Sequence, residues 1–381
     1  MLIYANAGLF CDGYILSSIG LALPSLAAHL HASDAQLGFT GAATLLGIMG
    51  GAVVFGPLTD RFGRRFLMIA DLALFVIASL LQFVVTELWQ LIALRVVLGV
   101  AIGADYPIAG ALISEFMPTR LRGAAVNSMQ VVWFLGATVA YIVGALLFAR
   151  NDAWRWILAS SAIPAAAGLA LRSTAPESVR WKTAPTVPLQ TLTEPPFFGR
   201  LVFVSAMWLL QVVPLFAIYT FAPIVLAALR IPSSSPLGSV AITSGFFLGS
   251  VVSMWLVESW GRRPLCIAGF AISTLVFAIV AQVPAAAVVA LFVVYAIAMG
   301  AAAGLELVYP TELFPTRLRA TATGIATSIS RVGAFTGTFA LPVFLSHAGV
   351  ASVTLACAIL SAAGLAISIR YAPETRGTEL L

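Results

Sequence analysis

Charged residues are scarce in this chain: of its 381 residues, 9% are Asp, Glu, Lys or Arg and 61% are hydrophobic. Soluble domains carry about 25% charged residues, so this composition excludes a water-soluble globular protein and indicates a chain whose solvent is lipid. Lysine is almost missing, because all of the twenty basic residues except Lys182 are arginines. The net charge of +5 is spread over short loops between apolar runs, which argues against a nucleic-acid partner.

Cysteine and histidine are equally sparse, with three residues of each. Cys11, Cys266 and Cys357 stand in apolar surroundings without paired spacing, which excludes a disulfide framework and a thiolate metal site. The histidines show no ligand spacing, and the chain contains no Gly-Lys-Ser/Thr phosphate loop and no nucleophile–base arrangement. We therefore expect no metal, no cofactor and no enzymatic activity.

Three short motifs occur twice, 197 or 198 residues apart, which is typical of a duplicated chain. This offset is too long for a solenoid repeat and fits two halves of about six membrane spans each. The paired motifs are Asp60-Arg61-Phe62-Gly63-Arg64-Arg65 with Glu258-Ser259-Trp260-Gly261-Arg262-Arg263, Glu115-Phe116-Met117-Pro118-Thr119-Arg120 with Glu312-Leu313-Phe314-Pro315-Thr316-Arg317, and Pro176-Glu177-Ser178 with Pro373-Glu374-Thr375.

Twelve apolar runs are long enough to cross a bilayer as helices, six in each half. We predict an all-α membrane protein with twelve transmembrane helices in two pseudo-symmetric six-helix bundles. The N-terminal bundle covers residues 1–172, a cytoplasmic linker covers 173–199 and the C-terminal bundle covers 200–381. The runs fall at 3–24, 36–58, 66–86, 88–114, 122–149, 153–172, 200–229, 237–257, 264–283, 285–311, 320–346 and 350–371.

The distribution of basic residues predicts the orientation of the chain. Loops after even-numbered spans, together with the C-terminus, hold fifteen of the twenty basic residues, and the opposite loops hold three. Because Lys and Arg accumulate on the cytoplasmic side, we expect both termini and the linker to be cytoplasmic. No basic segment or cleavage site marks a signal peptide, so we expect the first helix to remain in the membrane, the inner membrane of a bacterial cell.

With these features the chain resembles transporters of the major facilitator superfamily over nearly its whole length. The loop from Asp60 to Arg65 is similar to the superfamily's loop between spans two and three, and segments 176–181 and 373–377 are similar to the end-of-half signatures of sugar porters. Asp12-Gly13-Tyr14 and Gly103-Ala104-Asp105-Tyr106-Pro107 are similar to segments of metabolite:proton and aromatic-acid:proton symporters. The resemblance implies a proton-coupled metabolite transporter that works by alternating access.

Span one and span seven depart from those groups. Ile15 stands where aromatic-acid and phosphate symporters carry a second acid. In span seven, Leu210-Gln211 and Phe216 stand where sugar porters carry paired glutamines and an asparagine, and Val212 stands where phosphate symporters carry an acid. These departures argue against a sugar site and against a phosphate site.

Ionisable side chains inside the spans are costly in hydrocarbon, so each is expected to face an interior cavity and to have a partner. Arg95, Gly99 and Gly103 share a face of span four that, in the superfamily, meets span one and Asp12. We predict a proton switch between Asp12 and Arg95, with a permanent brace as the alternative. Asp105 points elsewhere, and hydroxyl groups of a neighbouring helix are the alternative account of its carboxylate. Of the in-span residues Asp12, Asp71, Arg95, Asp105, Glu306 and Arg331, we assign Asp12, Arg95, Asp105 and Glu306 to proton coupling.

Arg331, about a dozen residues into span eleven, resembles the buried arginine of aromatic-acid symporters and organic-anion carriers. A guanidinium is a planar fork of donors that suits a carboxylate. We predict that it binds the anionic group of the substrate; the alternative is an internal salt bridge to Glu306. Amide and aromatic side chains of spans four, five and seven are expected to complete the site, although aromatic residues in such helices also serve packing. The predicted substrate residues are Arg331, Gln130, Trp133, Gln211, Trp208, Tyr219 and Tyr106.

The charges of the repeated loops form two matching sets. By resemblance they latch the two halves together on the cytoplasmic side, and as a network they can bias a two-state equilibrium by a few kcal/mol. The alternative is that they only fix topology. The predicted gate residues are Asp60, Arg64, Arg65, Glu115, Arg122 and Glu177 in the first half, and Glu258, Arg262, Arg263, Glu312, Arg319 and Glu374 in the second.

We therefore expect a monomeric secondary transporter in the lipid bilayer that moves a small organic anion, a carboxylate metabolite or aromatic acid, together with protons. The alternatives are a transporter of a sugar, a polyol or another neutral metabolite, a drug:proton antiporter, and a membrane sensor that does not transport.

Overall fold

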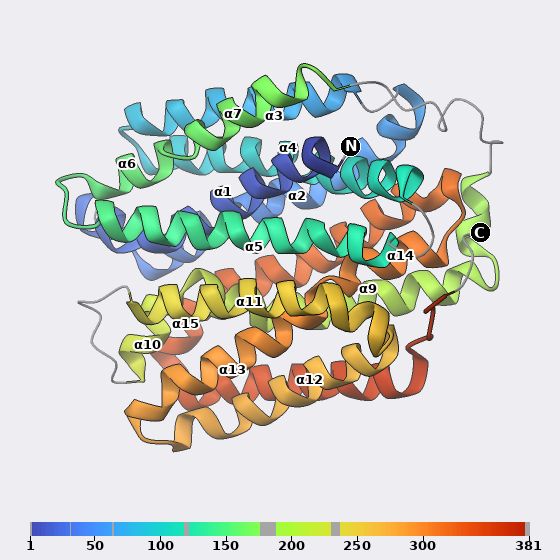
Figure 1. Cartoon of the computed structure of the whole chain (residues 1–381). Coiled ribbons are helices and arrows are strands. Elements are labelled where there is room, and N and C mark those ends of the chain that lie inside the picture. Colours follow the sequence, from blue (N-terminus) through green and yellow to red (C-terminus); the bar gives the residue numbers. More distant parts are fainter. Residues whose placement is uncertain are drawn as a thin grey trace.

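The computed structural model describes residues 2–30, 32–62, 65–117, 122–175, 188–229 and 237–377, and in this part of the chain the regular elements are helices (Figure 1). The first half contains α1 (Leu2–Leu30), α2 (Asp34–Phe62), α3 (Arg65–Leu81), α4 (Leu88–Phe116), α5 (Arg122–Leu147), α6 (Ala153–Ala159) and α7 (Ala162–Arg172). The second half contains α9 (Phe197–Thr220), α10 (Ala222–Ala228), α11 (Leu237–Ser259), α12 (Arg262–Ile279), α13 (Ala285–Ala303), α14 (Leu305–Leu313) and α15 (Thr316–Tyr371). Short 3-10 turns lie at Gln82–Val84, Leu189–Thr193 and Val280–Gln282.

The helices correspond to twelve membrane spans, as the sequence predicts. Ten segments of the described residues are long and apolar enough to cross a membrane. The last of these, α15, turns at Gly349, whose φ of 75° is open to glycine but costly for other residues, and it therefore supplies two spans. The short helices α6 and α7 together form one more. Figure 1 shows the two halves as neighbouring bundles, with both termini at the same end. The fold is that of two pseudo-symmetric six-helix bundles.

Glycines bring α4 against α2, not against α1 as we expected from span four. A Cβ atom at Gly99 would overlap the backbone of Thr44 and Gly47, and one at Gly103 would overlap Ile48. The same contact recurs in the second half, where Gly249 of α11 meets the Ile297 carbonyl and Gly300 of α13 meets the Phe246 carbonyl. Close backbone approach through small residues is how membrane helices pack tightly, and its recurrence shows that the sequence repeat is also a repeat in space.

Two seams join the bundles, and they too are equivalent. One seam joins α2 to α15, where Phe39 stands edge-on to Phe335 at 6.1 Å and the Ser328 hydroxyl donates to the Met49 carbonyl at 3.0 Å. The other joins α5 to α11, where Phe134 stacks on Phe246 at 5.2 Å. Spans two and eight, and likewise spans five and eleven, are repeat-related, so each seam pairs the same two positions of the repeat. The polar residues described below lie between these seams.

Adjacent glycines of α2 give a direct test of this packing. A Cβ atom at Gly51 would overlap the Val100 carbonyl of α4, whereas nothing lies within 4 Å of one at Gly50. We expect Gly51→Ala to destabilise the protein by about 1–3 kcal/mol, because the helices must separate, and Gly50→Ala to be neutral or mildly stabilising. Thermal unfolding of the two variants in detergent measures the difference. Equal melting temperatures would contradict the packing.

Candidate functional site

Arg331 of α15 lies at the centre of the molecule, 2% exposed and enclosed by aromatic rings. Its guanidinium carbon is 5.3 Å from the ring centre of Tyr106 on α4, 5.6 Å from that of Trp208 and 5.3 Å from that of Phe216, the latter two on α9. A cation over the face of an aromatic ring is stabilised by about 0.5–2 kcal/mol. Residues of both bundles thus form one aromatic cage around the Arg331 cation.

The cage opens onto a small cavity that lies between the bundles. Its volume is about 10 Å³, which is room for about one water molecule. The bundles therefore have to separate before a metabolite can enter. The residues that line it are Tyr106, Gln130, Trp133, Phe134, Val212, Leu215, Phe216, Glu306 and Arg331.

Several buried polar atoms around this cavity have no hydrogen-bond partner in the part of the chain that the structure describes. On Arg331 these are Nε and one terminal nitrogen, and the indole nitrogens of Trp133 and Trp208 and the amide nitrogen of Gln211 are likewise unpaired. A buried donor without a partner costs about 1–3 kcal/mol, and more when it is charged. Three of these donors, two on Arg331 and one on Trp133, belong to residues that line the cavity, so the cavity offers unpaired donors to an acceptor.

Most of the residues predicted to bind substrate are thus brought together. Tyr106, Gln130, Trp133 and Arg331 line the cavity, and Trp208 stands over the guanidinium. The predicted alternative, a salt bridge between Arg331 and Glu306, is not among the ion pairs of the described residues. Phe134, Val212 and Leu215 also line the cavity and escaped the sequence reasoning, because an apolar lining residue has the same pattern as a packed one.

Tyr219 of α9 lies beside the cavity, where it ties the two bundles together. Its hydroxyl forms a hydrogen bond with the Ser17 hydroxyl of α1, its backbone carbonyl accepts from Tyr141 at 2.6 Å, and its ring is 5.8 Å from that of Trp133. On the other side of the cavity, Asn127 of α5 fits against Gly304, the break between α13 and α14, where a Cβ atom would overlap it. Contacts between the bundles thus lie on both sides of the site.

The expected pair of Asp12 and Arg95 is not formed. Both side chains are fully buried, but among the described residues the Arg95 guanidinium donates to the Ile15 carbonyl, at 3.4 Å, and neither oxygen of Asp12 has a hydrogen-bond partner. Arg95 therefore reaches α1 three residues beyond Asp12, while the glycines of its helix face pack on α2. The charged groups that act on Asp12 are the carboxyl groups of Asp105 and Asp71 and the guanidinium groups of Arg172 and Arg331.

Arg172 is the functional candidate that the sequence reasoning missed. It stands at the end of α7, so we counted it with the loop arginines, yet its side chain is 0% exposed. It donates to Asp71 at 2.9 Å and to Asp105 at 2.7 Å, so a guanidinium takes the place of the hydroxyl groups that were the alternative account of Asp105. A signal was present: the first-half spans hold three acids and one base, which leaves acids in need of a cation.

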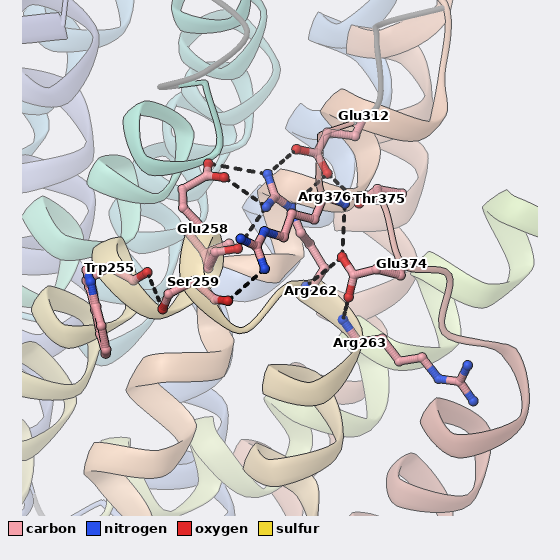
Figure 2. Close-up of polar contacts among 10 residues, drawn as sticks. Trp255, Glu258, Ser259, Arg262, Arg263, Glu312, Glu374, Thr375 and Arg376 are labelled. Atoms are coloured by element: carbon pink, nitrogen blue, oxygen red, sulfur yellow. Dashed lines mark hydrogen bonds and ion pairs between the residues drawn. The ribbon is translucent and has the colours of Figure 1, made fainter.

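At the arginine-rich end of the second half, charged side chains form a network around Arg262 (Figure 2). Arg262 binds Glu312 at 2.7 Å and Glu258 at 3.1 Å, and the Glu374 carboxylate accepts from the backbone N–H groups of Arg262 and Arg263 at 3.0 and 3.1 Å. Glu258 and Arg262 also lie against Gly123 of α5, in the other bundle. The network therefore sits at the contact between the two halves.

The other predicted gate residues are placed only in part. Arg319 is buried and donates to the Phe314 carbonyl at 3.3 Å, and Arg65 donates to the Ser173 carbonyl at 3.3 Å. The remaining predicted gate positions are outside what the structure describes: Arg64 and Glu177, and the side chains of Asp60, Glu115 and Arg122.

Comparison with known proteins gives matches along the whole chain. A family model described as sugar (and other) transporter matches residues 13–186 and 189–381. The metabolite transport protein YaaU of Escherichia coli is 37% identical over 411 aligned residues, covering 100% of this chain and 93% of the relative. The inner membrane metabolite transport protein YgcS of the same organism is 29% identical over 401, covering 97% and 90%. The structure of the proton:xylose symporter XylE bound to 6-bromo-6-deoxy-D-glucose has a TM-score of 0.83 at 21% identity, covering 100% and 96%, which shows the same fold.

The network around Arg262 predicts how the arginine-rich end responds to loss of one charge. The background variant Asn127→Cys places a thiol at a buried position between the network and the cavity. In this background we expect Glu312→Gln to be labelled by a polar thiol reagent about ten times faster. The reason is that losing about 1.4 kcal/mol of contact between the halves raises the fraction of molecules open at this end about tenfold. The control is Glu194→Gln on the exposed surface. Labelling at the same rate in both variants would contradict a latch.

Proposed function

Because the chain belongs to the sugar (and other) transporter family of the major facilitator superfamily, we propose that it carries a small organic carboxylate across the membrane together with protons. The family makes it a multi-pass membrane transporter and not an enzyme. The observation that carries the proposal is the guanidinium of Arg331, buried in an aromatic cage with two nitrogens unpaired.

A carboxylate fits these donors better than a neutral ligand does. Two acceptor oxygens in one plane match the planar fork of a guanidinium, and such a bidentate pair is roughly twice as strong as neutral hydrogen bonds. The rings of Tyr106, Trp208 and Phe216 offer flat apolar surface to the rest of the ligand. A small acid with a planar body, such as an aromatic acid, meets both requirements.

A sugar is the second candidate, supported by family membership and by the xylose symporter that shares the fold. Sugar hydroxyls need several amides or hydroxyls around them. Gln130 is the one amide among the residues that line the cavity, and Gln211 lies one position before Val212 on α9. The lining is therefore richer in apolar rings than in amide groups.

Charge balance gives the reason for proton coupling. Arg331 and Glu306 face the same cavity and together are neutral, while Asp12 interacts electrostatically with Arg331 as well. An arriving anion adds a negative charge in a region of low dielectric, where it is stable only if a carboxylate nearby takes up a proton. Glu306 and Asp12 are the acids placed to do so. Anion and proton then enter together and leave together.

The transport cycle follows from the two bundles, residues 1–172 and 200–381, which rock about the site between them. The network around Arg262 holds the arginine-rich end closed while the opposite end opens. The contact of Tyr219 with Ser17 holds the opposite end when the arginine-rich end opens. Because positive charge accumulates on the cytoplasmic side, we propose that the arginine-rich end and both termini lie in the cytoplasm, and that the carrier works as a monomer in an inner membrane.

Replacement of Arg331 tests the substrate class. In proteoliposomes with an inward proton gradient, we expect the wild type to accumulate 4-hydroxybenzoate and not D-xylose. Arg331→Lys keeps the charge but loses the planar fork, so we expect its KM for 4-hydroxybenzoate to rise at least tenfold, which corresponds to about 1.4 kcal/mol.

The matched control is Arg370→Lys, which removes a guanidinium at the exposed end of α15. Unchanged KM in Arg331→Lys would overturn the carboxylate fork. Accumulation of D-xylose in place of 4-hydroxybenzoate would establish the sugar alternative.

A further inference from the structure

A second cluster of buried charged residues lies within the N-terminal bundle, and it is not part of the proposed substrate site. Arg172 donates to Asp71 and Asp105 and also to three backbone carbonyls, of Tyr4, Met68 and Ala5, at 2.8, 3.1 and 3.2 Å. The five bonds reach α1, α3 and α4 from the end of α7. The three charged side chains are at most 2% exposed.

The charge of this cluster does not balance unless it holds a proton. Two carboxylates face one guanidinium, which leaves a net negative charge in a place where isolated charge is expensive. The carboxyl groups of Asp71 and Asp105 bind the two terminal nitrogens of the same guanidinium, at 2.9 and 2.7 Å. Two carboxylates that share one buried site repel each other, so one of them holds a proton, as in paired acids of other proteins.

One oxygen of the cluster remains open toward Asp12. Oδ2 of Asp105 is buried and has no hydrogen-bond partner among the described residues, and it faces Gly8 of α1, where a Cβ atom would overlap it. Asp12, whose two oxygens are also unpaired, follows Gly8 by one helical turn on the same side of α1, about 6 Å along the axis. One water molecule spans that separation.

The duplicated fold shows that these charges are not needed to build a bundle. Gly168 packs on Leu72 and Gly364 packs on Phe270, which aligns the two halves at this point. The positions equivalent to Asp71, Asp105 and Arg172 in the C-terminal bundle are Gly269, Ala302 and Ser368. Gly269 there touches Ala302, and the Ser368 hydroxyl donates to a carbonyl of its own helix at 2.7 Å. Small neutral residues fill the same place, so the ionised triad serves something other than packing.

We propose that Asp71, Asp105 and Arg172 form a proton-holding station between Asp12 and the arginine-rich end, which gives the coupled proton a route separate from that of the substrate. A proton that leaves Asp12 adds to Oδ2 of Asp105, and the proton already shared leaves from Asp71, so the charge of the station is restored. Arg172 is a positioning residue that holds both carboxyl groups in place. The proposal rests on the proton coupling of the proposed function.

The other ionisable groups that face the station are Cys11 on α1 and, on the far side of Asp12, Arg331. Arg95 on α4 donates to the Ile15 carbonyl of α1 and, among the described residues, forms no ion pair with the station or with Asp12. Arg172 is therefore the cation that holds the shared proton between Asp71 and Asp105.

Infrared spectroscopy of the purified protein tests the station without any substrate. We expect a carbonyl-stretch band of a protonated carboxyl group that shifts in deuterium oxide. Asp71→Asn and Asp105→Asn should each remove this band, because the remaining acid then pairs one-to-one with Arg172 and ionises. Asp12→Asn and Glu306→Gln should leave it. If the wild type lacks the band, or if both single variants retain it, the proposal is overturned.

A triple variant provides a control for the possibility that the single variants misfold. Asp71→Gly, Asp105→Ala and Arg172→Ser together give the first half the residues of the second, so the protein should fold with an unchanged melting temperature. In proteoliposomes we expect this variant to exchange 4-hydroxybenzoate across the membrane but to lose accumulation driven by a proton gradient. Retained accumulation would overturn the station. Failure of the proposed function differs, because the wild type itself would then move no protons with 4-hydroxybenzoate while the infrared band remained.

Discussion

A guanidinium inside an apolar bundle needs a partner for each of its N–H groups, and the two arginines at the heart of this protein meet that need differently. Arg172 has two carboxylates and three carbonyls around it. Arg331 has aromatic rings around it and two unpaired nitrogens. Arg172 therefore has its donors satisfied within the bundle, whereas Arg331 is stabilised by aromatic rings and keeps two nitrogens available to an acceptor.

The repeat explains how such groups come to lie between two similar bodies. The glycine contacts of α2 with α4 and of α11 with α13 make each bundle compact, and the seams of α2 with α15 and of α5 with α11 set the bundles face to face. Polar chemistry is distributed unevenly over this frame. The N-terminal bundle carries the acids Asp12, Asp71 and Asp105, and the C-terminal bundle carries Arg331 with Glu306, so the site exists only where the two meet.

The helical fold could be predicted from the sequence because hydrocarbon imposes long apolar runs, and the interior charges could be singled out because each is costly there. The partners of these interior charges could not be predicted. The face that α4 presents depends on which neighbour offers glycines, so Arg95 was assigned to Asp12 although its helix packs on α2. Arg172 looked like a loop residue because helix ends and loop starts have the same composition, and whether the end of α7 is buried depends on tertiary packing.

Arg172 also has a mechanical consequence. It fastens the last helix of the N-terminal bundle to three others, whereas the equivalent Ser368 is bonded within its own helix and to Cys266. The two halves therefore differ in how their last helix is tied to its neighbours: the bonds of one buried guanidinium hold the end of α7 to α1, α3 and α4, whereas a neutral hydroxyl–thiol contact ties the equivalent part of α15 to α12.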